Sequence, residues 1–436
     1  MSVAELVTLA CCDLAAITRG RSIPADAVEA HLRAGVGWVP ANHALTPHGP
    51  VAEGSPFGSI GDLRLLPDAS TRARVEPDRE DPALELILCD IVETDGGAWP
   101  ACPRTFLRAA LKQLQSELGC TLLASFEHEF QLLLEEPPEM PFSVVAQRRA
   151  QPFVGKVMDA LEQAGAEPER VFAEYAPHQF EIPVAAAPGL AAADRAVLLR
   201  EVVRDVARRC GTRATFTPLL DPENAGNGVH IHFSLLGTDG SPALYDANRA
   251  GRLSELGARF AAGVLAHAPA LCALTAPSPV SAGRLQPHHW SAGAVCVGER
   301  NREALLRIPP LVALTGDPGP QMRLEYRAAD GASNPYVALA VLVHAGIAGV
   351  RGGLQEPPIL DRDPSELDAG EGERYGVGAL PGSLSEALDA LAGDDEARAW
   401  LPRLLYDAHV AIKRSELDAS ARADPEELCR RYARIY

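Results

Sequence analysis

The spacing of apolar residues along the chain predicts long helices separated by short strands. Apolar side chains recur at three- and four-residue intervals in five segments, the pattern of a helix with a buried face. These segments are residues 103–118, 144–164, 193–210, 253–273 and 336–349. A shorter helix is expected at 24–34, and Ser383 and Glu386 suit the start of another helix that runs to 391. The Gly- and Pro-rich stretch 351–382 is expected to be a long exposed loop.

Acids, imidazoles and guanidiniums alternate with apolar residues in four segments that have the pattern of a strand or its end. Side chains two apart on a strand point to the same face, so Glu127 and Glu129 project together, as do His230 and His232. The same holds for the run that contains Glu325. The four motifs lie at 126–130, 174–181, 226–232 and 323–327. One alternating polar face alone is usual for a solvated strand, but four such motifs favour a common site.

Divalent cations would make such a face stable inside a protein. The flanking residues, among them Phe126, Phe130 and Phe180, predict core strands, where carboxylates repel one another unless positive charge neutralises them. Carboxylate oxygens with an imidazole are suitable ligands for Mg²⁺ or Mn²⁺. Guanidinium groups suit phosphate oxygens, and the candidates are Arg302, Arg307 and Arg323. Ordinary surface charge is the alternative explanation for these arginines.

With these motifs the chain resembles the glutamine synthetase superfamily over most of its length. Further matching segments lie at 66–71, 211–218, 300–302, 307–309 and 334–336. The resemblance implies an α+β protein with a small N-terminal β-grasp domain at 1–98 and a catalytic domain at 99–436. The catalytic domain of the family contains a curved antiparallel sheet with surrounding helices. A ring-shaped homo-oligomer is implied as well, expected to be a dodecamer of two hexameric rings.

The resemblance also implies a reaction and a set of roles. Members of the family transfer the γ-phosphoryl group of ATP to the side-chain carboxylate of glutamate, and an amine then displaces phosphate, with two or more Mg²⁺ or Mn²⁺ ions per site. By motif, Glu129, Glu174 and Glu181 resemble ligands of the metal nearer the amino acid, and Glu127, His230 and Glu325 resemble ligands of the metal at the ATP phosphates. The remaining matches are Arg302 for the γ-phosphate, Arg307, Arg323, His232 and Ser234 for ATP, and Gly226, Arg284 and Arg327 for the amino-acid substrate.

Departures from the family pattern concern the amine. Where ammonia-using members carry a flap glutamate, this chain has Trp290. No aspartate lies between 43 and 60 to match the ammonium-binding aspartate, and 141–171 lacks the family's tyrosine-bearing loop. Because an aromatic residue favours an organic amine over ammonium, the chain is more similar to the γ-glutamylamine ligases. His288 and His289 are candidates for accepting the amine's proton, or they are simply residues of a mobile loop.

Two alternatives for the function stay open. His178 and Ala225 stand where family members usually carry Gly and Asn, so the acid substrate is glutamate or a close analogue. The runner-up enzyme is a glutamine synthetase that uses ammonia. A different class of protein, a non-catalytic sensor or scaffold, would not need to keep six ligands that repel one another without metal.

Composition bounds the partners and the compartment. The net charge of -18 and a pI near 5.1 argue against nucleic acid and anionic membranes as partners. The N-terminus lacks the basic start of a signal peptide, and the nine cysteines show no metal-binding or disulfide framework, so a reducing, cytoplasmic location is expected. The longest apolar stretch, 336–350, is expected to be a buried helix.

Overall fold

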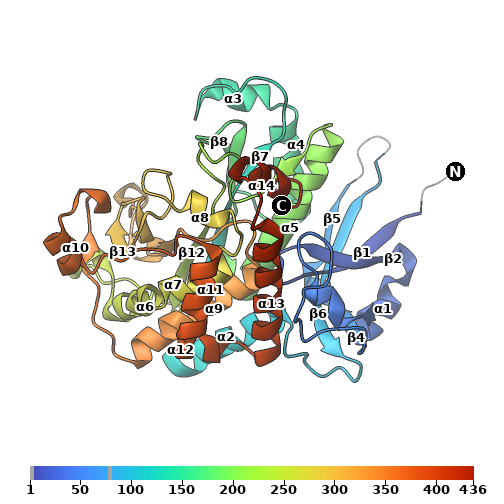
Figure 1. The fold of residues 1–436 in the computed structure, drawn as a ribbon, viewed down its shortest axis with the longest axis horizontal. Coiled ribbons are helices and arrows are strands. Elements are labelled where there is room, and N and C mark those ends of the chain that lie inside the picture. The colour runs from blue at the N-terminus through green and yellow to red at the C-terminus, as the bar shows by residue number, and fades with distance from the viewer. Residues whose placement is uncertain (1–3, 77–80) are drawn as a thin grey trace.

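The computed structural model describes residues 4–76 and 81–436, and it contains two sheets with helices packed around them (Figure 1). A six-stranded sheet is formed by the N-terminal part, drawn in blue, and a ten-stranded sheet by the rest of the chain. The predicted α+β class is confirmed.

The smaller sheet has the strand order β2-β1-β6-β4-β3, with β5 paired to β6. Strands β1 and β6 are parallel, and the other pairs are antiparallel. Its elements are β1 Leu6–Cys12, β2 Thr18–Pro24, α1 Val28–Ala34, β3 Val36–Trp38, β4 Leu63–Pro67, β5 Ala73–Val75 and β6 Leu84–Glu93.

The larger sheet has the order β16-β13-β14-β15-β12-β7-β9-β8, and β10 and β11 also pair with β7. Its centre is antiparallel, as expected, but β13 is parallel to both β14 and β16, so the sheet is mixed. The strands are β7 Thr121–Leu132, β8 Phe172–Ala173, β9 Gln179–Pro183, β10 Ala187–Pro188, β11 Ala214–Thr215, β12 Val229–Leu236, β13 Ala294–Glu299, β14 Ala304–Ile308, β15 Leu324–Tyr326 and β16 Ile359–Leu360.

The helices of the larger part surround this sheet (Figure 1). They are α2 Pro103–Leu118, α3 Val144–Arg149, α4 Phe153–Gln163, α5 Gly189–Arg209, α6 Glu255–Ala266, α7 Ala268–Thr275, α8 Ser281–Arg284, α9 Pro335–Arg351, α10 Ala369–Tyr375, α11 Leu384–Gly393, α12 Asp395–Trp400, α13 Arg403–Ser420 and α14 Pro425–Tyr432. Helix α9 is buried from Pro335 to Gly349, as its apolar sequence predicted. It crosses α6 so closely that a Cβ atom on Gly263 would lie 2.0 Å from the carbonyl oxygen of Ala345.

Three of the expected elements differ from the structure. The helix expected at 144–164 is divided before Pro152 into α3 and α4, and that expected at 253–273 is divided at His267, just before Pro269, into α6 and α7. Proline lacks the N–H group of a helix interior and clashes with the preceding turn, which explains both breaks. The stretch 351–382 is not a single loop, because it contains β16 and α10.

One buried arginine joins the two parts of the chain. Arg104 on α2 donates to Asp194 on α5, at 2.8 and 2.9 Å, and its other contacts are Asp68 and Asp90 of the N-terminal part, both at 3.0 Å. A guanidinium that donates hydrogen bonds to three carboxylates holds α2 against the smaller sheet.

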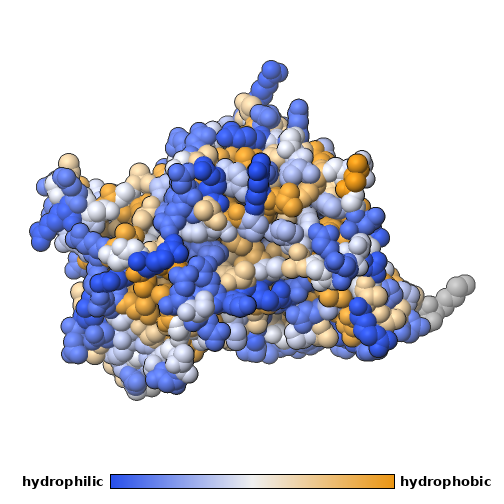
Figure 2. Space-filling model, turned by 90° about the horizontal axis from the view of Figure 1, so that it is seen from below, coloured by the Kyte–Doolittle hydropathy of each residue, from blue (hydrophilic) through white to orange (hydrophobic). Residues whose placement is uncertain are grey.

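Apolar residues occur both on the surface and in the helices. The face seen in Figure 2 carries patches of hydrophobic residues among hydrophilic ones. Within 4–76 and 81–436, no single helix has the length and apolar character needed to cross a membrane; α6 and α7 meet the criteria only as a pair, bent by 74°.

His344 on α9 gives a test of how the core responds to acid. Its ring stacks on Phe106 and Trp400, with centroids 5.4 and 5.9 Å away, and burial lowers the pKa of the imidazole to about 4. The unfolded chain takes up this proton near pH 6.5, so stability is lost as the pH falls from 6.5 towards 4. The variant His344→Phe keeps the stacking but has no group that titrates. Between pH 6.5 and 4.5 we expect its free energy of unfolding to fall by about 2 kcal/mol less than that of the unaltered protein. Denaturant melts at several pH values measure this, and parallel curves for the two proteins would contradict it.

Candidate functional site

The register of five adjacent strands brings the predicted charged residues onto one face of the larger sheet. Residues directly opposite one another on paired strands point to the same side. The facing pairs are Glu181 with Glu129, Glu127 with His230, His232 with Glu325, and Glu325 with Arg307. The alternation predicted for β7 is present, since His128, between the two glutamates, is fully buried and packs against Phe216.

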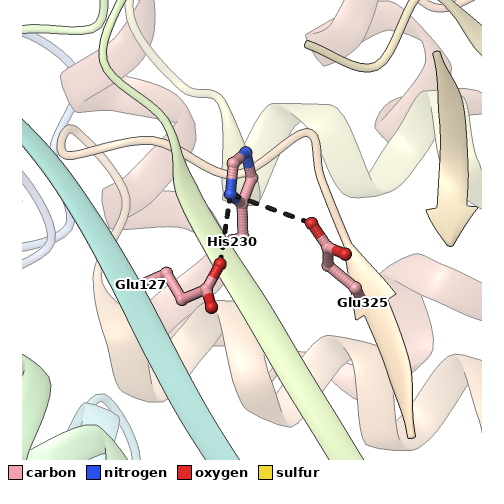
Figure 3. A group of neighbouring side chains, drawn as sticks. All are labelled: Glu127, His230 and Glu325. Carbon is pink, nitrogen blue, oxygen red and sulfur yellow. Dashed lines mark ion pairs between the residues drawn. The ribbon is translucent and has the colours of Figure 1, made fainter. Parts of the chain in front are cut away.

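The first potential metal group consists of Glu127, His230 and Glu325, which point toward one another from three strands (Figure 3). His230 Nδ1 lies 3.6 Å from Glu127 Oε2 and 3.8 Å from Glu325 Oε1, too far for hydrogen bonds. Within the part of the chain that the structure describes, neither ring nitrogen of this buried histidine has a hydrogen-bond partner. Three ligand atoms that converge without bonding one another leave the spacing that a bound cation requires.

The second group consists of Glu129, Glu181 and the same His230. Here Nε2 of His230 lies 3.8 Å from Glu129 Oε1. The motif comparison assigned Glu174 to this group and His230 only to the first, whereas the ligand atoms of Glu129, Glu181 and His230 lie within 4.8 Å of one another. Glu174, just after β8, is close enough to interact electrostatically with Glu129.

The carboxyl groups of the site differ in how far positive charge compensates them. Burial and the neighbouring carboxylates raise the pKa of Glu181 well above its ordinary value, and burial with Glu129 raises the pKa of Glu174 to about 8. The pKa of Glu325 is lowered to about 2, because Arg327 and the two histidines outweigh its burial. The positive charge near Glu174 and Glu181 therefore does not offset their burial and mutual repulsion, and a divalent cation would do so.

Arginines border the other side of the face. Arg307 donates to Glu325 at 2.7 Å, and Arg327 also pairs with Glu325. Arg323 Nε lies 3.2 Å from His232 Nδ1, while Arg302, just before β14, is exposed. Two of the guanidiniums expected to meet phosphate, Arg307 and Arg323, thus contact Glu325 and His232. Arg302 is close enough to interact electrostatically with Arg307 and Glu174.

A cleft of about 440 Å³ opens beside Arg323, and the predicted ATP-site residues His232 and Ser234 line it together with this arginine. Ser234 Oγ is used within the protein, where it donates to the carbonyl oxygen of Met322 at 2.9 Å. Sequence reasoning missed Arg170, which lines the same cleft and lies 3.7 Å from Glu127.

The predicted substrate-binding residues Gly226 and Arg284 pack directly on each other. A Cβ atom on Gly226 would lie 2.1 Å from the carbonyl oxygen of Pro218 and 2.7 Å from Cγ of Arg284, so only glycine fits. Arg284 is buried, and its Nη2 donates to the carbonyl oxygens of Ala328 and Ala329. In this structure it supports the wall of the site, with its other terminal nitrogen beneath Gly228.

A buried amide network that the sequence did not reveal holds the loop at 226–228. Gln179 Nε2 donates to Gly226 O at 2.9 Å and to Asn227 Oδ1 at 3.0 Å. Asn227 in turn donates to Gln131 at 3.1 Å. The signal was present in the motifs, since both Gln179 and Asn227 lie within them, but alternation alone does not separate a buried amide from a solvated one.

The three flap residues differ in their surroundings. His288 is exposed, with Nε2 3.3 Å from Ser365 Oγ and Nδ1 3.7 Å from Asp363. His289 is partly buried, and its Nδ1 has no hydrogen-bond partner among the described residues. Trp290 is 48% exposed, and its carbonyl oxygen accepts from Arg327 at 3.0 Å.

His178, which stands where family members usually carry glycine, has its side-chain contact outside the predicted site residues. Its φ of 54° lies in the region that favours glycine, and Nε2 lies 2.8 Å from the carbonyl oxygen of Glu136. The imidazole is therefore directed toward the segment that precedes α3.

Two family models match the chain along its length. The model of the glutamine synthetase N-terminal domain matches residues 1–99, and that of the glutamine synthetase catalytic domain matches residues 100–432. Among curated relatives, gamma-glutamylpolyamine synthetase GlnA3 of Streptomyces coelicolor is 32% identical over 98% of this chain and 92% of its own. The glutamine synthetase of Thermus thermophilus is also 32% identical, over 82% of this chain and 81% of its own.

Solved structures agree with these matches. A novel glutamine synthase homolog superposes with a TM-score of 0.92 at 48% identity, covering 100% of this chain and 99% of its own. GmaS without ligand superposes with a TM-score of 0.82 at 26% identity, covering 97% of this chain and 96% of its own. The resemblance extends over the whole fold.

Replacement of one of the crowded carboxylates tests whether these groups bind a cation. In Glu181→Gln we expect Mn²⁺ to bind about tenfold more weakly, because a ligand is lost, while the metal-free protein melts at a higher temperature because repulsion is relieved. Calorimetric Mn²⁺ titration and thermal melts with and without the ion measure the two effects. Glu373→Gln, at an exposed position, is the control. Unchanged Mn²⁺ affinity in Glu181→Gln would contradict the assignment.

Proposed function

The chain belongs to the glutamine synthetase family, and on this premise we propose that it joins the side-chain carboxylate of glutamate, or of a close analogue, to an organic primary amine as ATP is converted to ADP and phosphate. The observation that carries the proposal is that the chain has both features: two carboxylate–imidazole groups, and an exposed Trp290 at the position where ammonia-using relatives are expected to carry an acid.

The residues on the sheet face have complementary tasks in this reaction. Two groups of residues would hold the divalent cations of the family. They are Glu127, His230 and Glu325, and Glu129, Glu181 and His230, with Glu174 beside the second group. When bound, these cations supply the charge neutralisation that lets one anion attack another. Arg302, Arg307 and Arg323 bind the phosphate oxygens, and Arg327 and Arg284 maintain the amino-acid side of the site.

The chemistry proceeds in two displacements. A carboxylate oxygen of glutamate attacks the γ-phosphorus of ATP, the bond to ADP breaks, and an acyl phosphate forms. The amine nitrogen then attacks the carbonyl carbon, the bond to phosphate breaks, and the amide forms. The amine arrives as an ammonium group, so it must lose a proton before its lone pair can react.

His289 is the better-placed acceptor for that proton. Its buried Nδ1 is unpartnered among the described residues, whereas His288 contacts Ser365 and Asp363 on a neighbouring turn. A general base must have a free lone pair, and for this reason we favour His289 over His288.

We expect His289→Ala to lower kcat by about a hundredfold near pH 7, and the loss to shrink at higher pH where more amine is already neutral. His288→Ala should cost less than about fivefold, because its contacts are to the 363–365 turn. Steady-state rates from pH 6.5 to 9.5 measure both. Equal losses in the two variants would contradict the assignment of the base.

Substrate choice distinguishes this proposal from glutamine synthesis, for which the similarity to glutamine synthetases is the supporting observation. We expect phosphate release with glutamate and Mn²⁺ to respond to at least one organic amine with a kcat/KM about tenfold or more above that for ammonium. The panel contains ammonium, methylamine, ethanolamine, putrescine, spermidine and aniline, with Glu325→Gln as the inactive reference. A better kcat/KM for ammonium would favour glutamine synthesis, and no turnover with any amine would favour a sensor or scaffold.

Assembly into rings remains a prediction from the family. The hydrophobic patches in Figure 2 are consistent with contacts between copies. Sedimentation of the purified protein measures the number of subunits directly.

A further inference from the structure

Three exposed aromatic rings meet at the rim of the candidate site. Tyr175 stacks on Trp290, with ring centroids 5.8 Å apart and planes 25° apart, and the ring centroid of Phe142 lies 6.0 Å from that of Trp290. Phe142, Tyr175 and Trp290 are 52%, 47% and 48% exposed. Rings of this size are normally buried, so a half-exposed cluster of three indicates a binding surface.

The backbone is strained where two of the rings are held. Phe142 and Trp290 have φ values of 58° and 56°, a region that bulky side chains rarely adopt. Such a conformation is unfavourable and persists where the surrounding structure enforces it, as at functional sites. Both rings are thus held in place at an energetic cost.

The aromatic cluster is continuous with the reacting groups. Tyr175 directly follows Glu174, and the carbonyl oxygen of Trp290 accepts from Arg327, which pairs with Glu325. The rings are therefore connected directly to residues of the candidate site.

His178 positions the segment that supplies Phe142. Its Nε2 contacts Glu136 O at 2.8 Å, and its own carbonyl oxygen accepts from Leu132 N at 3.1 Å. The turn after β8 and the segment between β7 and α3 are thereby joined, near the top of Figure 1.

Among the residues that the structure describes, no group of acids converges beside the three rings. Glu139 is already paired with Arg149 at 2.9 Å, and Glu136 is exposed. A polyamine needs an anionic partner for its distal ammonium group, whereas an aryl or longer alkyl group needs only an apolar surface.

We propose that Phe142, Tyr175 and Trp290 form the binding wall for the body of the amine, and that the substrate is a primary monoamine with an aryl or extended alkyl group. This inference rests on the proposed amide-forming activity. His178 is a positioning residue, because it acts through the segment that carries Phe142.

The test compares 2-phenylethylamine, pentylamine, methylamine and putrescine by kcat/KM at fixed glutamate and ATP. Each buried methylene contributes about 0.8 kcal/mol, or roughly fourfold, so we expect 2-phenylethylamine and pentylamine to exceed methylamine by about tenfold or more. Phe142→Ala should reduce the ratio of 2-phenylethylamine to methylamine about tenfold, chiefly through the KM for the larger amine. Val144→Ala, at a 72% exposed position two residues away, should leave this ratio unchanged.

His178→Gly should lower the same ratio, and His178→Gln, which keeps a donor for Glu136 O, should restore part of it. A general loss of structure would instead lower the rates of all amines together. Putrescine preferred over pentylamine, or an equal loss for every amine in Phe142→Ala, would overturn the inference. Absence of amine-stimulated phosphate release would instead refute the proposed activity itself.

Discussion

The strand register around β7 is the constraint on which the site depends. It places Glu127 opposite His230 and Glu129 opposite Glu181, so the carboxylates cannot move apart without breaking the ladder of backbone hydrogen bonds. Burial of like charges at this spacing is unfavourable unless positive charge compensates them. Arg307 and Arg327 compensate Glu325, whereas burial and the neighbouring carboxylates raise the pKa of Glu181, so a bound cation would be needed to keep this carboxyl group charged.

Around this rigid charged face, the site has walls of two kinds. The inner wall is fixed, since Arg284 packs under Gly226 and the amides of Gln179 and Asn227 are bonded to each other. The outer rim consists of side chains from three separate loops that contact one another through rings. In the proposed reaction, activation of the acid would thus involve the part of the structure that tolerates little change, whereas recognition of the amine would involve the part that tolerates more.

The sequence predicted what depends on local periodicity and missed what depends on the path of the chain. The alternation around Glu127 and His230 was sufficient to place both on one face, because a strand has a fixed period of two. That these two residues lie directly opposite each other depends on the strand register, which cannot be read from a local sequence pattern. Pro152 and Pro269 divided two predicted helices whose apolar spacing was otherwise continuous. Phe142 gave no signal, since a loop residue comes to the rim only through the course of its loop, and the direction of His178 followed from its positive φ.

His230 belongs to both cation groups, and this has a consequence for how the protein can evolve. A substitution at this one position removes a nitrogen ligand from each group, so the amino-acid side and the phosphate side cannot diverge independently. Lineages that lose His230 would be expected to lose both halves of the reaction at once. Changes of substrate among such proteins must therefore accumulate at the rim, with the charged face inherited as a single unit.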